Sequence, residues 1–416
     1  MRKSIFYLAL LLVGCGGGGY FDMVPPEALE LRENFGGIAV ADFDGDGLND
    51  IAVGTTITED RQLVDTRISI YTQRTASPGS FLPPRLFDSN PNGSLAWTLV
   101  ADDCERNGLP DLIATNWDEG GFRLLVNDSE QPGTLMPSVH YETGPADSTF
   151  GRSQAVGDID ADGFPDVVIV TEYSVQWIPQ NAGNLGTFDA PRPIGEGRDD
   201  VQLGDVNGDG LLDVVVLGVD GDVSKSILVY YNNTNAPGQF LAPRRLVTGD
   251  FADHIGIADY DGNGRTDIAV AVMQFDADDF DQHGAVVVFR QIGPDSFSQS
   301  AVTRTGGIGG TDVFETANLD GDIFPELVFQ IGSAARGAVV RIMESNASGA
   351  LTIRLELTVP DEPENYSSGW PRLSIGDLNN DTLDDIALIH KGLYVFLRRS
   401  GVALAFDEAA KLNTHP

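Results

Sequence analysis

A nine-residue acidic segment that recurs seven times constrains this 416-residue chain more than any other feature. The copies begin every 47 to 61 residues, and each carries oxygen-bearing side chains at positions 1, 3 and 5. Such self-similarity indicates a repeat architecture, in which one supersecondary unit is copied along the chain. In order, the copies read DFDGDGLND at 42, DCERNGLPD at 103, DIDADGFPD at 158, DVNGDGLLD at 205, DYDGNGRTD at 259, NLDGDIFPE at 318 and DLNNDTLDD at 377.

Each acidic segment lies between two short apolar runs, and two further runs follow before the next copy. The run after the segment, such as IAVGT at 51–55, is nearly continuously apolar, which is typical of a strand buried on both faces. The third run, such as RISIYTQ at 67–73, alternates as a half-buried strand does, and the prolines of the fourth suit an outer edge. We therefore expect the inner two strands of each unit to be the most buried.

Four strands per unit in seven units predict an all-β fold, a seven-bladed β-propeller with four antiparallel strands per blade. A β-solenoid is the alternative, although its repeats are usually shorter. The pattern leaves ring closure open. Residues 25–34 resemble a fourth run, yet 401–412 already supply one for the last blade, so the N-terminal segment either completes the last sheet or adds an edge. Residues 27–34 and 408–412 weakly favour helix.

The acid excess narrows the classes of partner. Asp and Glu number 62 against 26 Lys and Arg, for a net charge of -36, and such a surface repels nucleic acid phosphates and anionic lipid. With 42% hydrophobic residues the chain can still build a core. The acids therefore indicate metal ligands, a solvated surface, or both, and they argue against nucleic acid binding.

The N-terminus has the pattern of an export signal. Basic residues precede an apolar run at 5–13 that is too short to span a bilayer, and the run ends in LVGC at 12–15, which resembles the lipobox of bacterial lipoproteins. By that resemblance 1–14 is a signal peptide, Cys15 carries the lipid, 15–24 is a tether and 25–416 is one propeller, anchored to the bacterial cell envelope. An ordinary signal peptide with an incidental cysteine is the alternative. With Cys15 lipidated, Cys104 has no partner for a disulfide.

The acidic segments have the chemistry of calcium loops. In the first copy Asp42, Asp44 and Asp46 would each supply one oxygen, the carbonyl of Leu48 another, and Asp50 would close the shell. An EF-hand closes with Glu at position 12, where this chain has Val53, so an EF-hand is excluded. The other predicted ligand sets are Asp103, Glu105, Asn107 and Asp111; Asp158, Asp160, Asp162 and Asp166; Asp205, Asn207, Asp209 and Asp213; Asp259, Asp261, Asn263 and Asp267; and Asp377, Asn379, Asp381 and Asp385.

The copies differ in quality, so we expect four to six bound Ca²⁺. Glycine at position 6 permits a left-handed turn, and Thr382 in the seventh copy should be strained there. The sixth copy starts with Asn318, has Ile323 at position 6 and ends with Glu326, so we expect it to be empty. The alternative for every copy is an Asx-rich turn without metal.

These repeats resemble the FG-GAP/VCBS family, which includes the propeller of integrin α-subunits. Phe35-Gly36 and Phe150-Gly151 match the "FG" of the family, and Gly54-Thr55 stands where the family has "GAP". The resemblance covers about residues 35–412. It implies that each acidic loop joins the first and second strands of its blade and binds calcium. It also implies that ligands meet the opposite face.

The sequence favours a binding module over an enzyme. No HExxH, GxSxG or phosphate-loop pattern is present, and the acidic neighbours of Cys104 would raise its pKa rather than activate the thiol. Two long loops, 56–66 and 274–284, and the aromatic residues Trp97, Trp117, Tyr141 and Trp370 suggest contact with a glycan or protein. For Trp97 and Trp370 the favoured alternative is packing between blades. The alternatives are a polysaccharide-acting lyase or hydrolase with its site at the central channel mouth, and an assembly role in the envelope.

Overall fold

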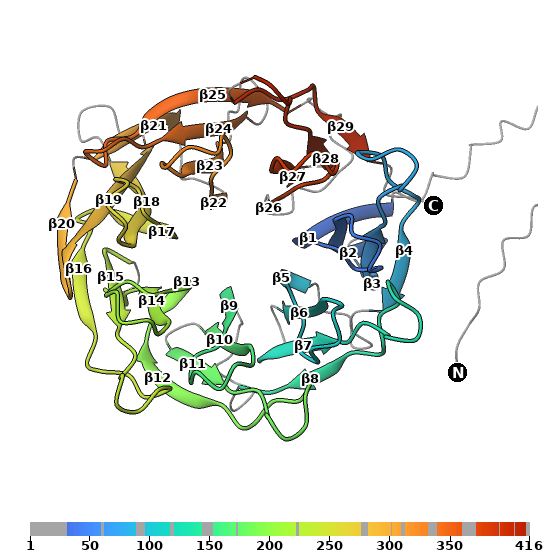
Figure 1. The fold of residues 1–416 in the computed structure, drawn as a ribbon, viewed down its shortest axis with the longest axis horizontal. Helices are drawn as coiled ribbons and strands as arrows, with labels where there is room; N and C mark the ends of the chain where they lie inside the picture. Colours follow the sequence, from blue (N-terminus) through green and yellow to red (C-terminus); the bar gives the residue numbers. More distant parts are fainter. Residues whose placement is uncertain are drawn as a thin grey trace, which may run out of the picture.

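The described chain forms a ring of seven antiparallel sheets around a central axis (Figure 1). The computed structural model describes residues 31–59, 62–88, 96–116, 120–143, 153–171, 174–221, 224–275, 282–300, 302–308, 313–331, 339–359, 372–390, 392–402 and 404–412. Consecutive strands pair in every sheet, and these residues include no helix. The predicted seven-bladed β-propeller is therefore confirmed.

Each blade is one continuous segment of chain, and its four strands follow one another outward from the axis. Blade by blade, the strands are β1 (Leu31–Ala41), β2 (Asp50–Glu59), β3 (Gln62–Tyr71) and β4 (Arg85–Asp88); β5 (Ala96–Asp102), β6 (Asp111–Asn116), β7 (Phe122–Leu125) and β8 (Val139–Tyr141); β9 (Ser153–Gly157), β10 (Asp166–Val170), β11 (Ser174–Ile178) and β12 (Arg192–Glu196); β13 (Arg198–Gly204), β14 (Asp213–Leu217), β15 (Ser226–Tyr230) and β16 (Arg244–Val247); β17 (Phe251–Ala258), β18 (Asp267–Phe275), β19 (Gln282–Gly293), β20 (Ser296–Gln299) and β21 (Thr303–Ile308); β22 (Val313–Ala317), β23 (Glu326–Ile331), β24 (Val339–Glu344) and β25 (Thr352–Thr358); and β26 (Arg372–Gly376), β27 (Asp385–Ile389), β28 (Leu393–Phe396) and β29 (Ala410–Leu412).

The core lies between the blades. Seven clusters of buried apolar side chains are present, and each joins residues of two neighbouring sheets. Val215 of the fourth blade, for example, shares a cluster with Ile255 and Val270 of the fifth. Each sheet thus buries both of its faces, which explains why the second run of every repeat is continuously apolar.

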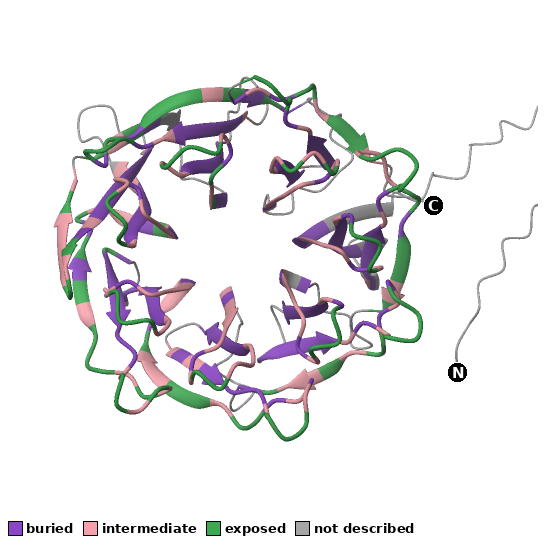
Figure 2. Ribbon diagram, viewed as in Figure 1, coloured by how far each residue is buried: buried purple, intermediate pink, exposed green. Residues whose placement is uncertain are grey.

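Burial by strand position differs in part from the prediction. The second strands β10, β14 and β27 are wholly buried, as expected. The third strands β7, β15 and β28 are also wholly buried, so their predicted half-burial is wrong. The innermost strands β9 and β26 are mostly half-exposed because they line the central channel, whereas outer strands such as β4 are exposed (Figure 2).

The fifth blade departs from the four-strand plan. Its outermost position is shared by two short strands, because β20 pairs with the end of β19 around Phe289 and β21 pairs with its start around Ala285. The sheet therefore has five strands in four positions.

Side-chain packing closes the ring between the last and first blades. The last sheet takes all four strands from residues 372–412, and residues 31–34 belong to β1 and pair with β2. Residues 31–34 therefore do not complete the last sheet, and the weak helical pattern is wrong at 31–34 and 410–412. Ile51 and Leu378 share one buried cluster across the closure, and the Asn49 Nδ2 donates to the Asp377 carbonyl over 3.1 Å.

Several predictions lie outside the described residues. They include the signal peptide, Cys15, the tether, Phe150-Gly151, Trp117 and Trp370. Within the described part of the chain, no helix is long and apolar enough to cross a membrane.

Candidate functional site

The acidic segments join the first and second strands of their blades, as predicted. In the first loop the backbone folds around Asp42, whose Oδ1 accepts from the Asp46 N–H at 3.1 Å and whose Oδ2 accepts from the Gly47 N–H at 2.8 Å. Gly47 has φ 87°, a left-handed conformation that suits glycine. The same two bonds recur in the second to fifth and seventh loops, where the first residue is Asp103, Asp158, Asp205, Asp259 or Asp377.

The closing aspartate of each loop has a structural role that the sequence analysis missed. Asp50 is fully buried, and its two oxygens accept the backbone N–H groups of Phe43 at 3.1 Å and Gln73 at 2.8 Å. The closing residue therefore ties the loop to the end of the third strand. Five further closing acids make both bonds, namely Asp111, Asp166, Asp213, Asp267 and Asp385.

The loops gather carboxylates closely enough to share a cation. Asp42, Asp44 and Asp50 place one oxygen each within 4.8 Å of one another, and the corresponding acids of the third and fifth loops do the same. Asp46 and Asp162 at position 5 fall outside these groups. Three mutually close carboxylate oxygens match the hard-oxygen chemistry of Ca²⁺, so positions 1, 3 and 9 fit that ion.

The two weakest loops behave differently. Thr382 has φ 69°, which confirms the strain expected at position 6, and its N–H still reaches Asp377 at 2.8 Å. In the sixth loop the first residue, Asn318, bonds instead through its Nδ2 to the carbonyl of Asp322 at 2.6 Å. The seventh loop therefore keeps the common geometry, and the sixth does not.

Two further features of the loops escaped the sequence analysis. Position 2 is fully buried in every loop, and Cys104 at that position has a raised thiol pKa, chiefly through burial and then through nearby acids, as predicted from its neighbours. Side-chain amides that follow the third strands also form hydrogen bonds between neighbouring blades. Asn127 donates to the carbonyl of Phe43 at 2.8 Å, and Gln180 to that of Cys104 at 2.6 Å. These contacts join residues of different blades, so only the packing of one blade on the next reveals them.

The raised pKa values of the closing aspartates predict that the stabilisation by calcium depends on pH. Burial, with help from nearby loop carboxylates, raises their pKa from 3.8 to about 7 in the metal-free protein, for example in Asp50 and Asp213. A carboxyl with a raised folded pKa stabilises the fold fully below its unfolded pKa, and this contribution is lost as pH rises through 7. Ca²⁺ binds the ionised form, so the increase in melting temperature caused by calcium should grow between pH 5 and pH 8. Calorimetry with and without calcium at pH 5 and pH 8 measures this increase in melting temperature. An increase of equal size at both pH values would contradict the prediction that calcium binds the ionised closing aspartates.

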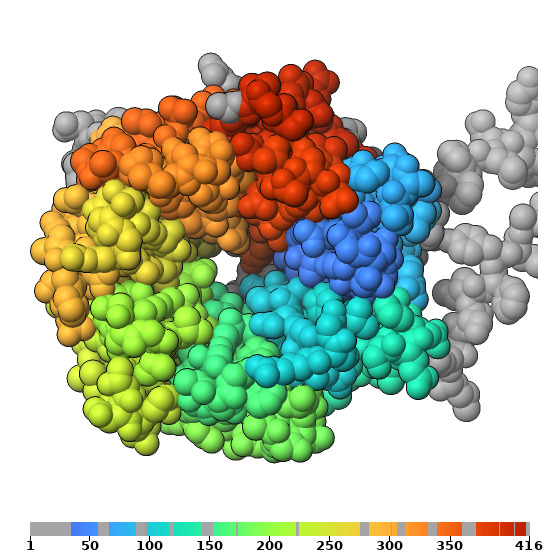
Figure 3. All heavy atoms as spheres, viewed as in Figure 1, coloured from blue at the N-terminus to red at the C-terminus, as the bar shows by residue number. Residues whose placement is uncertain are grey.

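A second candidate site lies in the central channel, which Figure 3 shows as a hollow at the centre of the ring. The cavity has a volume of about 380 Å³ and is lined by the innermost strands. Its polar side chains lie toward the starts of those strands, away from the acidic loops that follow them. They include Ser153, Gln154, Asp199, Asp200, Gln202, His254, Glu315 and Arg372.

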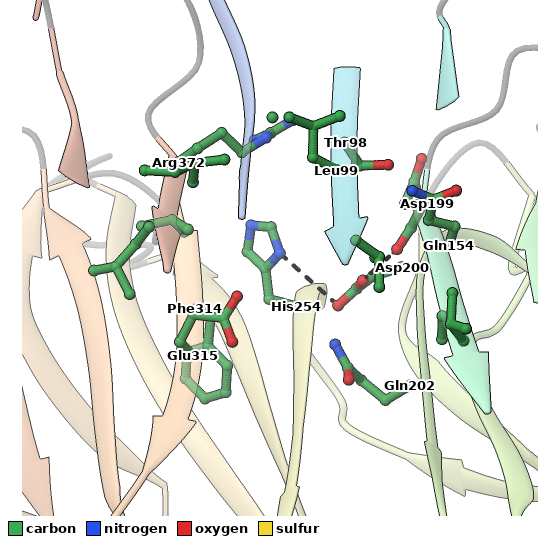
Figure 4. A pocket seen from close by; sticks show the side chains of 18 of the residues that line it. Thr98, Leu99, Gln154, Asp199, Asp200, Gln202, His254, Phe314, Glu315 and Arg372 are labelled. Carbon is green, nitrogen blue, oxygen red and sulfur yellow. Dashed lines mark hydrogen bonds and ion pairs between the residues drawn. The ribbon is translucent and has the colours of Figure 1, made fainter. Parts of the chain in front are cut away.

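Asp200 is the centre of this cluster (Figure 4). Its Oδ1 accepts from the Ser153 hydroxyl of the third blade at 2.9 Å, and its Oδ2 accepts from the Ile255 N–H of the fifth blade at 2.9 Å. The same Oδ2 lies 3.9 Å from His254 Nδ1. A bulge in β13 between Arg198 and Val201 places Asp200 there, with its neighbour Asp199 at φ 60°. One carboxylate thus connects three blades.

Enclosure by protein shifts the titration of the surrounding groups. The Glu315 side chain is exposed to the channel, but the surrounding ring encloses it. The resulting loss of solvation, followed by the charge of Asp200, raises the pKa of Glu315 to about 8. Burial likewise raises the pKa of Asp200, and it lowers that of Arg372 to about 10. At neutral pH the cluster therefore includes, in Glu315, a carboxylic acid that can donate a hydrogen bond.

The loops and aromatic residues that the sequence predicted as contact sites are only partly described, and none of their described residues lines the channel cavity. Residues 60–61 and 276–281 of the two long loops, and the side chain of Trp97, are outside the description. Tyr141 lies in β8, stacks on Phe122 of its own blade with ring centroids 5.0 Å apart and meets Phe188 of the third blade edge-on at 5.3 Å, so it packs between the two blades. The sequence analysis named none of the channel residues.

Comparisons with known proteins agree with the fold. A family model for the FG-GAP-like repeat matches residues 158–216 and 205–270, and no curated protein matches the chain. A solved lectin from Agrocybe aegerita, which recognises non-reducing terminal N-acetylglucosamine, is 18% identical with a TM-score of 0.53, over 90% of this chain and 93% of that one.

Two other solved structures are similar at lower scores. BBS1N, solved in complex with ARL6DN, is 11% identical with a TM-score of 0.51, over 88% of this chain and 92% of that one. A rhamnogalacturonan lyase from Bacillus licheniformis is 13% identical with a TM-score of 0.46, over 88% and 72%. At such identities these likenesses show the fold alone. The chain is a seven-bladed β-propeller in which residues 158–270 match the FG-GAP-like repeat.

Proposed function

We propose that the propeller is a calcium-stabilised binding module that takes the end of an uncharged glycan into the mouth of its central channel. The observation that supports this is the cavity of about 380 Å³ in which acids, amides and a hydroxyl from several blades converge. This volume lies within the usual range of small-ligand pockets, about 300–1,000 Å³. Convergent polar groups on a rigid scaffold are typical of such sites.

The charge of the cavity favours a neutral, hydroxyl-rich ligand. Sugar hydroxyls donate well to carboxylates, and Asp200 and Glu315 line the cavity as acceptors or, when protonated, donors. An anionic polysaccharide would meet these acids and a chain of net charge -36, against the cationic side chain of Arg372. Polar groups built to bond hydroxyls also reject ligands that lack them.

Two conservative substitutions test the proposal. Glu315→Gln and Asp200→Asn in the full chain should weaken binding of a glycan selected on an array roughly 10- to 100-fold, as expected for losing a charge-assisted hydrogen bond. Titration calorimetry measures the affinity. Glu130→Gln, on an exposed turn outside the channel, is the matched control and should leave it unchanged. Unchanged binding in both channel variants would show that the glycan binds outside the channel, for example at the loops 56–66 and 274–284.

A hydrolase or lyase acting on polysaccharide is the second candidate, and one observation favours it. Glu315, with a pKa of about 8, and the pair of Asp200 and His254 would provide a general acid and a general base in one cavity. The same variants distinguish the two functions. New reducing ends or unsaturated products that form with the native chain and disappear with Glu315→Gln would establish the enzyme; binding without product supports the module.

A further inference from the structure

The sixth acidic loop departs from the other six in a way that its sequence does not reveal. Asn318, at position 1, has its amide oxygen engaged by the Gly321 N–H at 2.8 Å and its Nδ2 engaged by the Asp322 carbonyl. Ile323 at position 6 is 68% exposed. Position 1 therefore offers no carboxylate here, and together with Ile323 at position 6 and Glu326 at the end it is the reason that the sequence predicted an empty loop.

Its closing residue, Glu326, has a buried oxygen without a partner. Glu326 is 0% exposed, and one oxygen accepts the Leu319 N–H at 2.7 Å, but Oε1 is buried and bonded to nothing among the described residues. In the fifth loop the corresponding oxygen of Asp267 accepts the Gln291 N–H at 2.7 Å. A buried polar oxygen left unpaired is unfavourable, and a charged one more so.

Two further carboxylates surround that residue. Asp320 of the loop and Glu344 of β24 place oxygens within 4.8 Å of one from Glu326. Glu344 is the partner of Glu326 in strand register, and like charges directly opposite each other destabilise a sheet. Among the described residues, Glu344 is paired with Arg354, whose Nε lies 2.6 Å from the Glu344 carboxylate and whose side chain is 46% exposed.

We propose that Asp320, Glu326 and Glu344 bind a divalent calcium-type cation at the sixth blade, with a ligand from the third strand in place of the missing one at position 1. Two oxygens that share a Ca²⁺ lie at most about 5 Å apart, since each Ca–O distance is about 2.3–2.6 Å. The observed spacing of 4.8 Å or less meets this limit. The ion would give the buried Oε1 of Glu326 a partner and separate the opposed charges of Glu326 and Glu344. This inference does not depend on the proposed function of the channel.

The exposed Arg354 would compete with the ion for Glu344. A partly exposed ion pair of this kind contributes about 0.2–1 kcal/mol, so its removal should strengthen cation binding at this one site about 1.4- to 5-fold. Arg354 therefore provides a substitution that leaves the core and all three ligands in place.

The number of calcium ions bound per chain tests the site. Equilibrium dialysis of the full chain with radioactive Ca²⁺ should show one ion fewer for Glu344→Gln than for the native chain. The matched control Glu356→Gln, on the neighbouring strand with a 51% exposed side chain, should keep the native number. An unchanged number in Glu344→Gln, or the loss of more than one ion, would overturn the proposal.

If the Glu344→Gln variant does not fold, calcium titration of the Arg354→Gln variant tests the proposed site instead. Calcium titration should then show one site with an affinity 1.4- to 5-fold higher and the others unchanged. Affinities that are all unchanged in Arg354→Gln would overturn the proposal.

Discussion

Removing calcium should lower the melting temperature of the propeller by roughly 15 °C. Each site held at a hundredfold excess of calcium over its Kd contributes about 2.7 kcal/mol, and four to six sites together about 11–16 kcal/mol. For a domain of nearly 400 residues, the unfolding entropy of about 0.8 kcal/mol/K converts this sum into a shift of roughly 14–20 °C. The effect is large because the sites add their contributions to one ring.

The loops also explain why the whole ring should respond. The side chain of Asp44 lies against the turn of the second blade, where a Cβ added to Gly133 would be 3.1 Å from the Asp44 Cβ. Asp160 contacts the turn at Gly238 of the fourth blade in the same way, at 3.2 Å. Each loop therefore supports the interface to the next blade. Without a cation, the carboxylates that crowd the loop repel each other at that interface.

Differential scanning calorimetry with EDTA, followed by calcium restoration, measures the shift. Added CaCl₂ should restore the original melting temperature, whereas MgCl₂ at the same ionic strength should restore little, because Mg²⁺ demands octahedral geometry and keeps its waters. An unchanged melting curve in EDTA would leave the loops as Asx turns without metal.

The second large effect concerns a closing aspartate in the metal-free protein. Asp213→Ala, measured by urea unfolding in EDTA at pH 5, below the raised pKa of about 7, should lower the free energy of unfolding by about 3–5 kcal/mol. The Asp213 carboxyl group is 0% exposed and accepts the N–H groups of Val206 at 3.1 Å and Asn232 at 2.8 Å. The substitution removes both hydrogen bonds and leaves two buried donors without partners.

Asp209→Ala in the same loop is the control. Asp209 is exposed and accepts from the Leu211 N–H at 3.0 Å within the loop, so its loss in EDTA should cost only about 1 kcal/mol. In calcium both variants lose ligands of the same predicted ion. Equal costs in EDTA would mean that Asp213 acts through the metal alone, contrary to the structure.

The repeat pattern was sufficient to predict most of the fold. Strand number, strand order and the place of the acidic loops follow from local signals that recur seven times, so an error in one copy is corrected by the others. The strain at Thr382 was predictable for the same reason, because position 6 is glycine in five other copies. The burial of the third strands could not be predicted in this way. In β7, for example, Arg123 stands between Phe122 and Leu124, yet the two neighbouring blades cover the whole strand.

The sixth blade shows how a local pattern can mislead. Its loop differs from most other copies at positions 1, 6 and 9, and the sequence therefore predicted an empty site. Glu344 lies 18 residues beyond Glu326 and outside the repeat motif, and only the pairing of β23 with β24 brings the two together. The register between strands, rather than the spacing within a loop, decides which acids are neighbours.

The sequence by itself determined the architecture of this protein, because each blade is a short-range unit whose strands pair with their immediate neighbours in the chain. It also placed the acid clusters of the first, third and fifth loops, since the members of each cluster lie within nine residues. Only the tertiary structure decided what lies at the centre. Ser153, Asp200, His254, Glu315 and Arg372 come from five blades and share no motif. They meet because the inter-blade packing closes the ring, and no local pattern along the chain carries that information.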